Sequence, residues 1–224
     1  MKILMKSIFK VLIFLPFAFY ACGPSVYFEK PQPQRTSNQK SFKSPFMGTY
    51  RSANDSSSII ISPKMIMREG KVLIRRTRGD IDSSHSYRLQ KDTLIDLSSR
   101  KKFPVKISND TITYQLPEKD TLFVVSKDKL LRFMKGNHFL NYKISENHWY
   151  VKKMGFDKDG SLLISEIKVP DDIDNFKLIA EVKEMRGQDN PNSLEYLLDP
   201  KKKEMKAFLD KNGFRNTIRY TRIK

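Results

Sequence analysis

The chain has 224 residues, with 42 Lys and Arg against 25 Asp and Glu, which gives a formal charge of +17. A basic chain can attract nucleic acid, but this one has no helix-turn-helix, zinc-finger or RNP-type pattern, so we expect no nucleic-acid partner. Without its first 21 residues, the chain would still be long enough for one domain with a proper core.

Residues 1–21 have the pattern of a secretory signal peptide, in which a basic start precedes a short apolar run. Lys2, Lys6 and Lys10 supply the charge, and residues 11–21 form the apolar run. A membrane-spanning helix needs about 20 apolar residues, and this run has only eleven. We therefore expect the segment to be removed rather than to stay in the membrane.

Cys22 is the only cysteine in the chain and directly follows the apolar run. Phe19-Tyr20-Ala21-Cys22-Gly23 resembles the lipobox of bacterial lipoproteins, in which the cysteine is acylated and becomes the first residue of the mature chain. The resemblance implies that Cys22 carries fatty-acyl chains such as palmitate. No thiol would then remain for a disulfide, redox chemistry or a metal. The alternative is a soluble secreted protein with a free thiol.

Three further segments resemble lipoproteins of Bacteroidota that have no known activity. They are residues 28–33 (FEKPQP), 46–50 (FMGTY) and 198–204 (LDPKKKE). In that group a PQP tail is followed by a β-rich domain and a terminal helix. The resemblance implies a lipoprotein anchored in the cell envelope, at the outer membrane. Residues 23–26 lack the acidic run that this group uses for surface export, which favours the periplasmic side.

Residues 22–45 are expected to form the lipidated N-terminus and a flexible tether. Residues 23–41 are rich in Pro, Gln, Ser and Lys and show no apolar periodicity, a composition typical of linkers. Fully extended, such a segment reaches at most about 65 Å. The tether would hold a single globular domain, residues 46–224, away from the membrane.

From residue 46 onward the pattern predicts β-structure. Asp92, Asp110 and Asp120 each precede a Thr-Leu or Thr-Ile pair, which predicts a turn followed by a strand. Hairpin turns are also expected at residues 69–71 and 157–160, where a glycine is available. Alternating or β-branched runs predict strands at 58–61, 65–68, 72–76, 111–116, 122–125, 138–144, 149–153, 162–167 and 176–184.

The C-terminal part predicts one helix and a last strand. Asp199 can cap the helix, Pro200 suits its first position and Gly213 ends it. Met205, Phe208 and Leu209 would form its apolar stripe. A final strand is expected at residues 214–221. The predicted fold is mainly β (α+β): an antiparallel meander curled or closed into a barrel-like domain, with one C-terminal helix followed by a strand.

Residues 155–166 have part of the spacing of a calcium-binding EF-hand loop. Asp157, Asp159 and Glu166 fall at ligand positions, but Gly155 stands where the first carboxylate is needed. The flanking residues predict strands, whereas an EF-hand needs helices. A hairpin turn is the better interpretation, and we expect no metal.

The other candidate reactive groups are few. Residues 80–85 contain Asp, Ser and His types, but neighbours in one loop rarely form a catalytic triad. His85, His138 and His148 show no metal-ligand spacing, and His138 and His148 are expected at half-exposed sheet positions. We therefore expect no catalytic residues, no metal ligands and no cofactor.

Two sets of side chains could contact a partner. Phe139, Tyr142, Trp149 and Tyr150 lie close in sequence and either pack in the core or form a ligand surface. Basic clusters at residues 75–78, 100–102 and 201–203 are either solvated faces or attract an anionic envelope component.

Together these patterns indicate a lipid-anchored envelope protein with a non-enzymatic binding or structural role, attached to the membrane through its N-terminal lipid. The partner would be an anionic envelope component or a protein. One alternative is a lipocalin-like binder of a hydrophobic or anionic ligand, which requires a lined cavity. Another is an envelope hydrolase, in which His85 or His148 would meet a serine or carboxylate from a distant strand.

Overall fold

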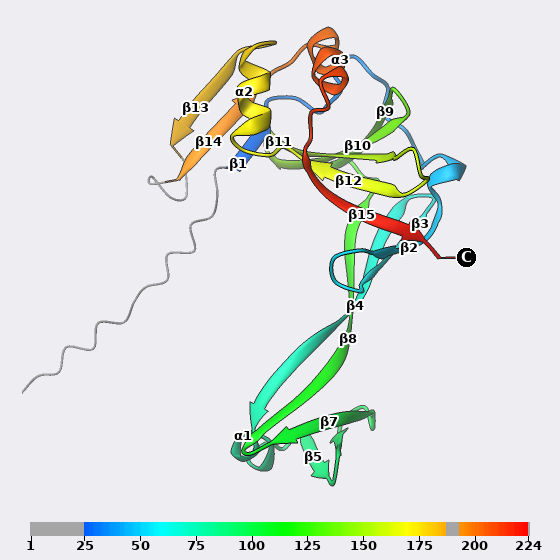
Figure 1. The fold of residues 1–224 in the computed structure, drawn as a ribbon, viewed down its shortest axis with the longest axis vertical. Coiled ribbons are helices and arrows are strands. Elements are labelled where there is room, and N and C mark those ends of the chain that lie inside the picture. Colours follow the sequence, from blue (N-terminus) through cyan, green and yellow to red (C-terminus); the bar gives the residue numbers. More distant parts are fainter. Residues whose placement is uncertain (1–24, 187–192, 224) are drawn as a thin grey trace, which may run out of the picture.

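The computed structural model describes residues 25–186 and 193–223. Within these residues, 15 strands join into one sheet, accompanied by three α-helices and a short 3-10 helix, η1 (Ser44–Phe46) (Figure 1). The predicted mainly β class is confirmed. The sheet is mixed rather than purely antiparallel, because β1 (Ser25–Phe28) pairs in parallel with β14 (Leu194–Leu198).

The larger part of the sheet curls around a first hydrophobic core. Its strands, in hydrogen-bonded order, are β9 (Lys129–Met134), β10 (Asn137–Ser145), β11 (His148–Phe156), β12 (Leu162–Glu166), β15 (Asn216–Arg222), β2 (Gly48–Ser52), β3 (Ser58–Ser62), β4 (Met65–Thr77) and β8 (Thr111–Val124). Because side chains alternate between the two faces of a strand, every second residue points into this core. Its members include Phe46, Tyr50, Phe123, Leu140 and Met154.

The predicted closure into a barrel is not found. Closure would require β8 to pair with β9, but β8 pairs with β4 and β7 (Lys102–Ser108), and β9 pairs with β10. The free edge of β9 instead meets the N-terminal segment, where the Gln39 amide donates to the Leu131 carbonyl at 2.7 Å. A chain segment therefore occupies the edge that a closed barrel would need.

Residues 25–45 are part of the folded domain, which corrects the expected tether. β1 lies between β11 and β14, and Phe28 and Phe42 are fully buried. The backbone amide of Gln32 donates to Asn141 Oδ1 in β10, a buried hydrogen bond. The Pro- and Gln-rich composition concealed the short alternation of Val26 and Phe28, which supplies two core positions. Cys22 lies outside the described residues.

The outer face of the curled sheet carries a second core and two helices (Figure 1). α2 (Asp171–Lys177) and α3 (Lys202–Asp210) cover this face, and β13 (Val182–Arg186) extends the sheet beyond β14. Residues 176–184, expected as a strand, instead end α2 and begin β13. Phe176 explains the difference, because it is fully buried against Phe208 of α3, with ring centroids 4.4 Å apart.

The C-terminal helix and the last strand are confirmed as α3 and β15. Met205 and Phe208 are buried and Leu209 packs against the same core, as the stripe predicted. The helix begins at Lys202 rather than at Pro200, because the Asp199 carboxylate is bound to Lys30 and Gln34 instead of capping the helix.

We call the curled part of the sheet with its two cores the body. A long arm projects from the body, and the outer halves of β4 and β8 form this arm (Figure 1). β5 (Tyr87–Gln90), β6 (Thr93–Asp96) and β7 extend its sheet, and α1 (Arg78–Asp82) packs beside it. The arm has its own small core, which includes Ile81, Leu94, Val105, Ile112 and Tyr114.

Two predicted turns in the β4–β8 ribbon are wrong. Gly70 lies inside the continuous strand β4, opposite Glu118, and Asp120 lies inside β8, opposite Arg68. Cross-strand pairing along the whole β4–β8 ribbon overrides the local preference of Gly and Asp for turns.

Candidate ligand-binding cavity

A cavity of about 380 Å³ opens on the inner face of the curled sheet. Alternation along β10, β11, β12 and β15 directs its lining side chains inward. Most of the wall is apolar, formed by Ile66, Leu122, Leu140, Ile144, Ile164, Ile218 and the ring of Tyr220. Its volume lies within the range of small-molecule sites, about 300–1,000 Å³.

An ion pair stands in the wall of this cavity. Lys152 Nζ lies 2.6 Å from Glu166 Oε1, and the two side chains are 30% and 29% exposed. Their backbones lie on β11 and β12, whose register pairs Lys153 with Ser165. The adjacent residues 152 and 166 therefore face each other on the cavity side. A half-buried pair of this kind provides one positive and one negative group beside an apolar wall.

Two tyrosines complete the polar side of the cavity. Tyr142 and Tyr150 are direct cross-strand partners on β10 and β11, with ring centroids 6.0 Å apart. Burial raises the pKa of both phenols, and the Glu166 carboxylate adds to the rise at Tyr150. Both hydroxyl groups therefore stay protonated at neutral pH. The Tyr150 hydroxyl is hydrogen-bonded to the Glu166 carboxylate, whereas the Tyr142 hydroxyl can donate a hydrogen bond to a ligand.

A second hollow of about 590 Å³ adjoins the cavity. The two share Ile144, Tyr150, Glu166 and Asn216. From there the hollow runs towards Ser25, Val26 and Tyr27 in β1. We call these two adjoining hollows, which extend from Ser25 to the interior of the curled sheet, the groove.

The four aromatic residues that lie close in sequence are divided between the two faces. Tyr142 and Tyr150 line the cavity, whereas Phe139 and Trp149 are buried in the core beneath the helices. The sequence did not single out Lys152, and it marked Glu166 only as a position of the calcium loop that was considered. The only available signal was the alternation of residues 149–153, which places Tyr150 and Lys152 on one face but does not show what that face encloses.

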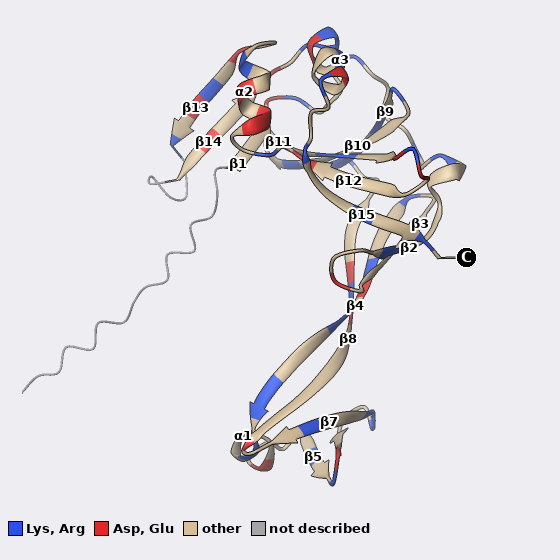
Figure 2. Cartoon of the chain, viewed as in Figure 1, with Lys and Arg blue, Asp and Glu red and all other residues tan. Residues whose placement is uncertain are grey.

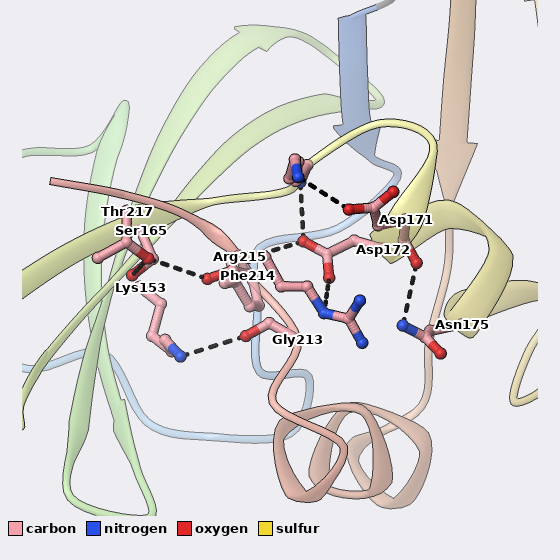
Figure 3. A network of polar contacts seen from close by, with 10 residues as sticks. Lys153, Ser165, Asp171, Asp172, Asn175, Gly213, Phe214, Arg215 and Thr217 are labelled. Carbon is pink, nitrogen blue, oxygen red and sulfur yellow. Dashed lines mark hydrogen bonds and ion pairs between the residues drawn. The ribbon is translucent and has the colours of Figure 1, made fainter.

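Asp172 is the centre of a separate buried polar network (Figure 3). Its Oδ2 accepts hydrogen bonds from the backbone amides of Lys168 and Arg215, each at 2.8 Å. Its Oδ1 lies 3.4 Å from Arg215 Nε. The network ties the start of α2 to the chain entering β15. Oδ2 is fully hydrogen-bonded, and Oδ1 has only the ion contact with Arg215 among the described residues. Because the contacts join two segments of the chain, we interpret the network as a structural clip.

Lys153 and Thr217 extend the contacts around this clip (Figure 3). Lys153 Nζ donates to the Gly213 carbonyl at 3.2 Å, and burial lowers the pKa of this amine. The Thr217 hydroxyl donates to Ser165 Oγ at 2.8 Å. These contacts link β11, β12 and the α3–β15 connection.

His138 is fully buried, which corrects its expected half-exposed position. Its ring packs edge-on against Phe42, Phe46 and Phe133, and Nε2 accepts a hydrogen bond from the Lys43 amide at 3.1 Å. Burial lowers the pKa of His138 to about 4. The imidazole is therefore neutral at physiological pH and acts as a core residue.

The other groups considered for catalysis serve local structure. His148 Nδ1 lies 3.0 Å from Ser145 Oγ of the same hairpin, and its ring meets Tyr27 of β1 edge-on, with centroids 5.5 Å apart. His85 is exposed after α1. Asp80 caps that helix, because its Oδ2 accepts from the Thr77 amide at 3.1 Å.

Residues 155–166 form the predicted β-hairpin between β11 and β12. The carboxylates of Asp157 and Asp159 both pair with Arg219 of β15. Among the residues that the structure describes, no three His, Cys, Asp or Glu side chains are grouped to hold a metal ion.

Comparisons with protein-family models, with curated proteins and with solved structures find no match. In residues 25–186 and 193–223, no helix has the length and apolar character needed to cross a bilayer.

Proposed function

We propose that this chain is a lipid-anchored, non-enzymatic envelope protein that binds an amphiphilic ligand inside its curled sheet. The observation that supports this most strongly is the cavity of about 380 Å³, with its apolar wall and its Lys152–Glu166 pair. A lined cavity of this size is what a lipocalin-like binder requires.

The lining favours a ligand with an apolar body and one polar end. Aliphatic side chains such as Leu140 and Ile164 would cover the body, at about 25 cal/mol for each Å² of apolar surface removed from water. The phenol of Tyr142 would donate a hydrogen bond to the polar end, and the Lys152–Glu166 pair would offer it one positive and one negative group.

The proposed anchor is acylated Cys22. Only residues 23 and 24 separate it from Ser25, the first residue of β1. Attachment by two or more acyl chains makes membrane binding stable. On this proposal the domain sits close to the membrane, at the periplasmic face of the outer membrane, with the groove at Ser25 beside the anchor.

A fluorescent probe with a charged end, dansyl-labelled fatty acid, tests the cavity. Ile218→Trp places a large ring at the rim of the cavity, and we expect it to weaken probe binding at least about tenfold, a change of about 1.4 kcal/mol. Ile107→Trp is the matched control, because Ile218 is 39% exposed and Ile107, in the arm, is 43% exposed. Equal affinities in both variants, or no binding by the parent protein, would overturn the proposal.

A further inference from the structure

The sheet of the arm has two faces of different composition. Its strands lie in the order β4, β8, β7, β6, β5. One face forms the small core beside α1, with Ile74, Leu94, Val105 and Tyr114 among its members. The residues between these core positions point to the opposite face, which we call the outer face of the arm.

From Lys71 towards the tip of the arm, the outer face carries five cations and no carboxylate; Glu69, two residues before Lys71 on β4, is paired with Lys119. Lys71 and Arg75 come from β4, Arg88 from β5, and Lys102 and Lys106 from β7; all five are exposed. Figure 2 shows this concentration of Lys and Arg on β4 and β7. None of the five forms an ion pair with any residue in the described part of the chain. No carboxylate in residues 25–186 or 193–223 therefore neutralises their charge.

The register spreads these charges in two dimensions. Thr113 of β8 pairs with both Arg75 and Lys106, so one neutral strand separates the two cations. Ile95 of β6 separates Arg88 from Lys102 in the same way. Because adjacent strands are about 4.8 Å apart, each pair of Cα positions is separated by about 10 Å.

Neutral and apolar groups lie between the cations. Lys71 and Lys106 border a shallow hollow of about 540 Å³, together with Leu73, Pro104 and Gln115. Leu73 is 50% exposed. The outer face thus combines cations with an apolar side chain that is free to enter an interfacial layer.

We propose that the outer face of the arm docks on the surface of a bilayer that contains anionic lipids. A two-dimensional array of unpaired cations is complementary to a layer of anionic headgroups, and Lys or Arg near such a surface is attracted to it. A basic patch is also a recognised second attachment for an acylated protein. The inference rests on one part of the proposed function, the lipid anchor that brings the protein to a membrane.

The test uses the chain from residue 22 with Cys22→Ala, so that no acyl chain contributes. Co-sedimentation compares phosphatidylcholine vesicles with and without phosphatidylglycerol. The outer-face variant changes five residues to Gln: Lys71, Arg75, Arg88, Lys102 and Lys106. The control variant removes the same charge elsewhere, by changing five exposed lysines to Gln: Lys201, Lys202, Lys203, Lys206 and Lys211.

We expect the parent chain to bind only the vesicles with phosphatidylglycerol, and added salt to release it. The outer-face variant should bind at least about thirtyfold more weakly. Each cation near an anionic surface contributes about 1 kcal/mol, so the loss would be about thirtyfold even if only two of the five contact the bilayer. The control variant should bind like the parent. Circular dichroism and thermal melts confirm that both variants fold.

Three outcomes would overturn the inference. The parent chain could fail to distinguish the two vesicles, or both variants could lose binding equally, which would assign the effect to net charge. The outer face could also bind soluble polyphosphate but no vesicle, which would assign it to a soluble polyanion. Because the test lacks the acyl chain, its failure would leave the anchor at Cys22 and the cavity unaffected.

Discussion

His138 shows how burial changes the behaviour of one side chain. Its ring is surrounded by phenylalanines, the Lys43 ammonium lies 3.5 Å from the centre of the Phe133 ring, and the pKa of His138 falls from 6.5 to about 4. The unfolded state therefore binds a proton more readily than the folded state between these two pH values. In that range, the free energy of unfolding must decrease as the pH falls.

We expect this decrease to reach about 3 kcal/mol between pH 6.5 and 4. His138→Phe removes the titrating group. The free energy of unfolding of this variant should therefore depend much less on pH in this range than that of the parent, even if the two proteins differ in stability at pH 7. Urea unfolding at a series of pH values measures both curves. Asp55 and Asp96 have pKa values lowered from 3.8 to about 2, so their contributions to stability are lost only below about pH 4. Parallel curves for the two proteins would show that His138 is not responsible.

Asp172 is expected to stabilise the fold rather than to take part in chemistry. Asp172→Ala would leave the backbone amides of Lys168 and Arg215 without their acceptor, and an unsatisfied buried group costs about 1–3 kcal/mol. We therefore expect a loss of about 2–5 kcal/mol in the free energy of unfolding. Asp174→Ala, an exposed position in the same helix, is the control and should change little. Similar melting temperatures for both variants would contradict this assignment.

At the scale of single elements, β1 ties the N-terminal segment into the sheet. Phe28 is fully buried, and its ring meets Phe176 of α2 edge-on at 6.3 Å. We expect Phe28→Ala to lower the free energy of unfolding by about 3–5 kcal/mol. Lys40→Ala, exposed in the same segment, should stay within about 0.5 kcal/mol of the parent. A flexible tether would instead make both substitutions neutral, and chemical denaturation distinguishes the two cases.

Elements with a strong local pattern could be predicted from the sequence. Alternation located β3, β10, β11 and β12, and the apolar stripe located α3. β1 and β14 could not be found in this way. Their parallel pairing joins residues far apart in the chain, such as Val26 and Tyr196, and a local pattern does not show such a pairing. In β4 and β8, tertiary pairing extended the strands through Gly70 and Asp120, where local turn preference predicted breaks.

The cavity could be predicted only in part. The aromatic cluster indicated Tyr142 and Tyr150, but it also included Phe139 and Trp149, which the strands direct into the opposite core. The pairing of Lys152 with Glu166 depends on the register of β11 and β12, and sequence patterns do not specify register between strands. Which face of a strand encloses a cavity depends on how the whole sheet curls.

At the scale of the whole molecule, the body and the arm provide two separate surfaces. The body contains the cavity and the groove that begins at Ser25, whereas the arm carries the unpaired cations of its outer face (Figure 2). On our proposal, the acyl chains at Cys22 hold the body at the membrane. Cys22→Ala should then abolish fatty-acid labelling and move the protein from the membrane to the soluble fraction.

Native mass spectrometry of the protein purified from its envelope tests the central claim most directly. Our account predicts a covalently acylated chain beginning at Cys22, carrying a non-covalent amphiphile that is released on denaturation. Ile218→Trp should keep the acyl mass and lose the amphiphile, whereas Ile107→Trp should keep both. A chain with a free thiol at Cys22 and no bound amphiphile would contradict the account.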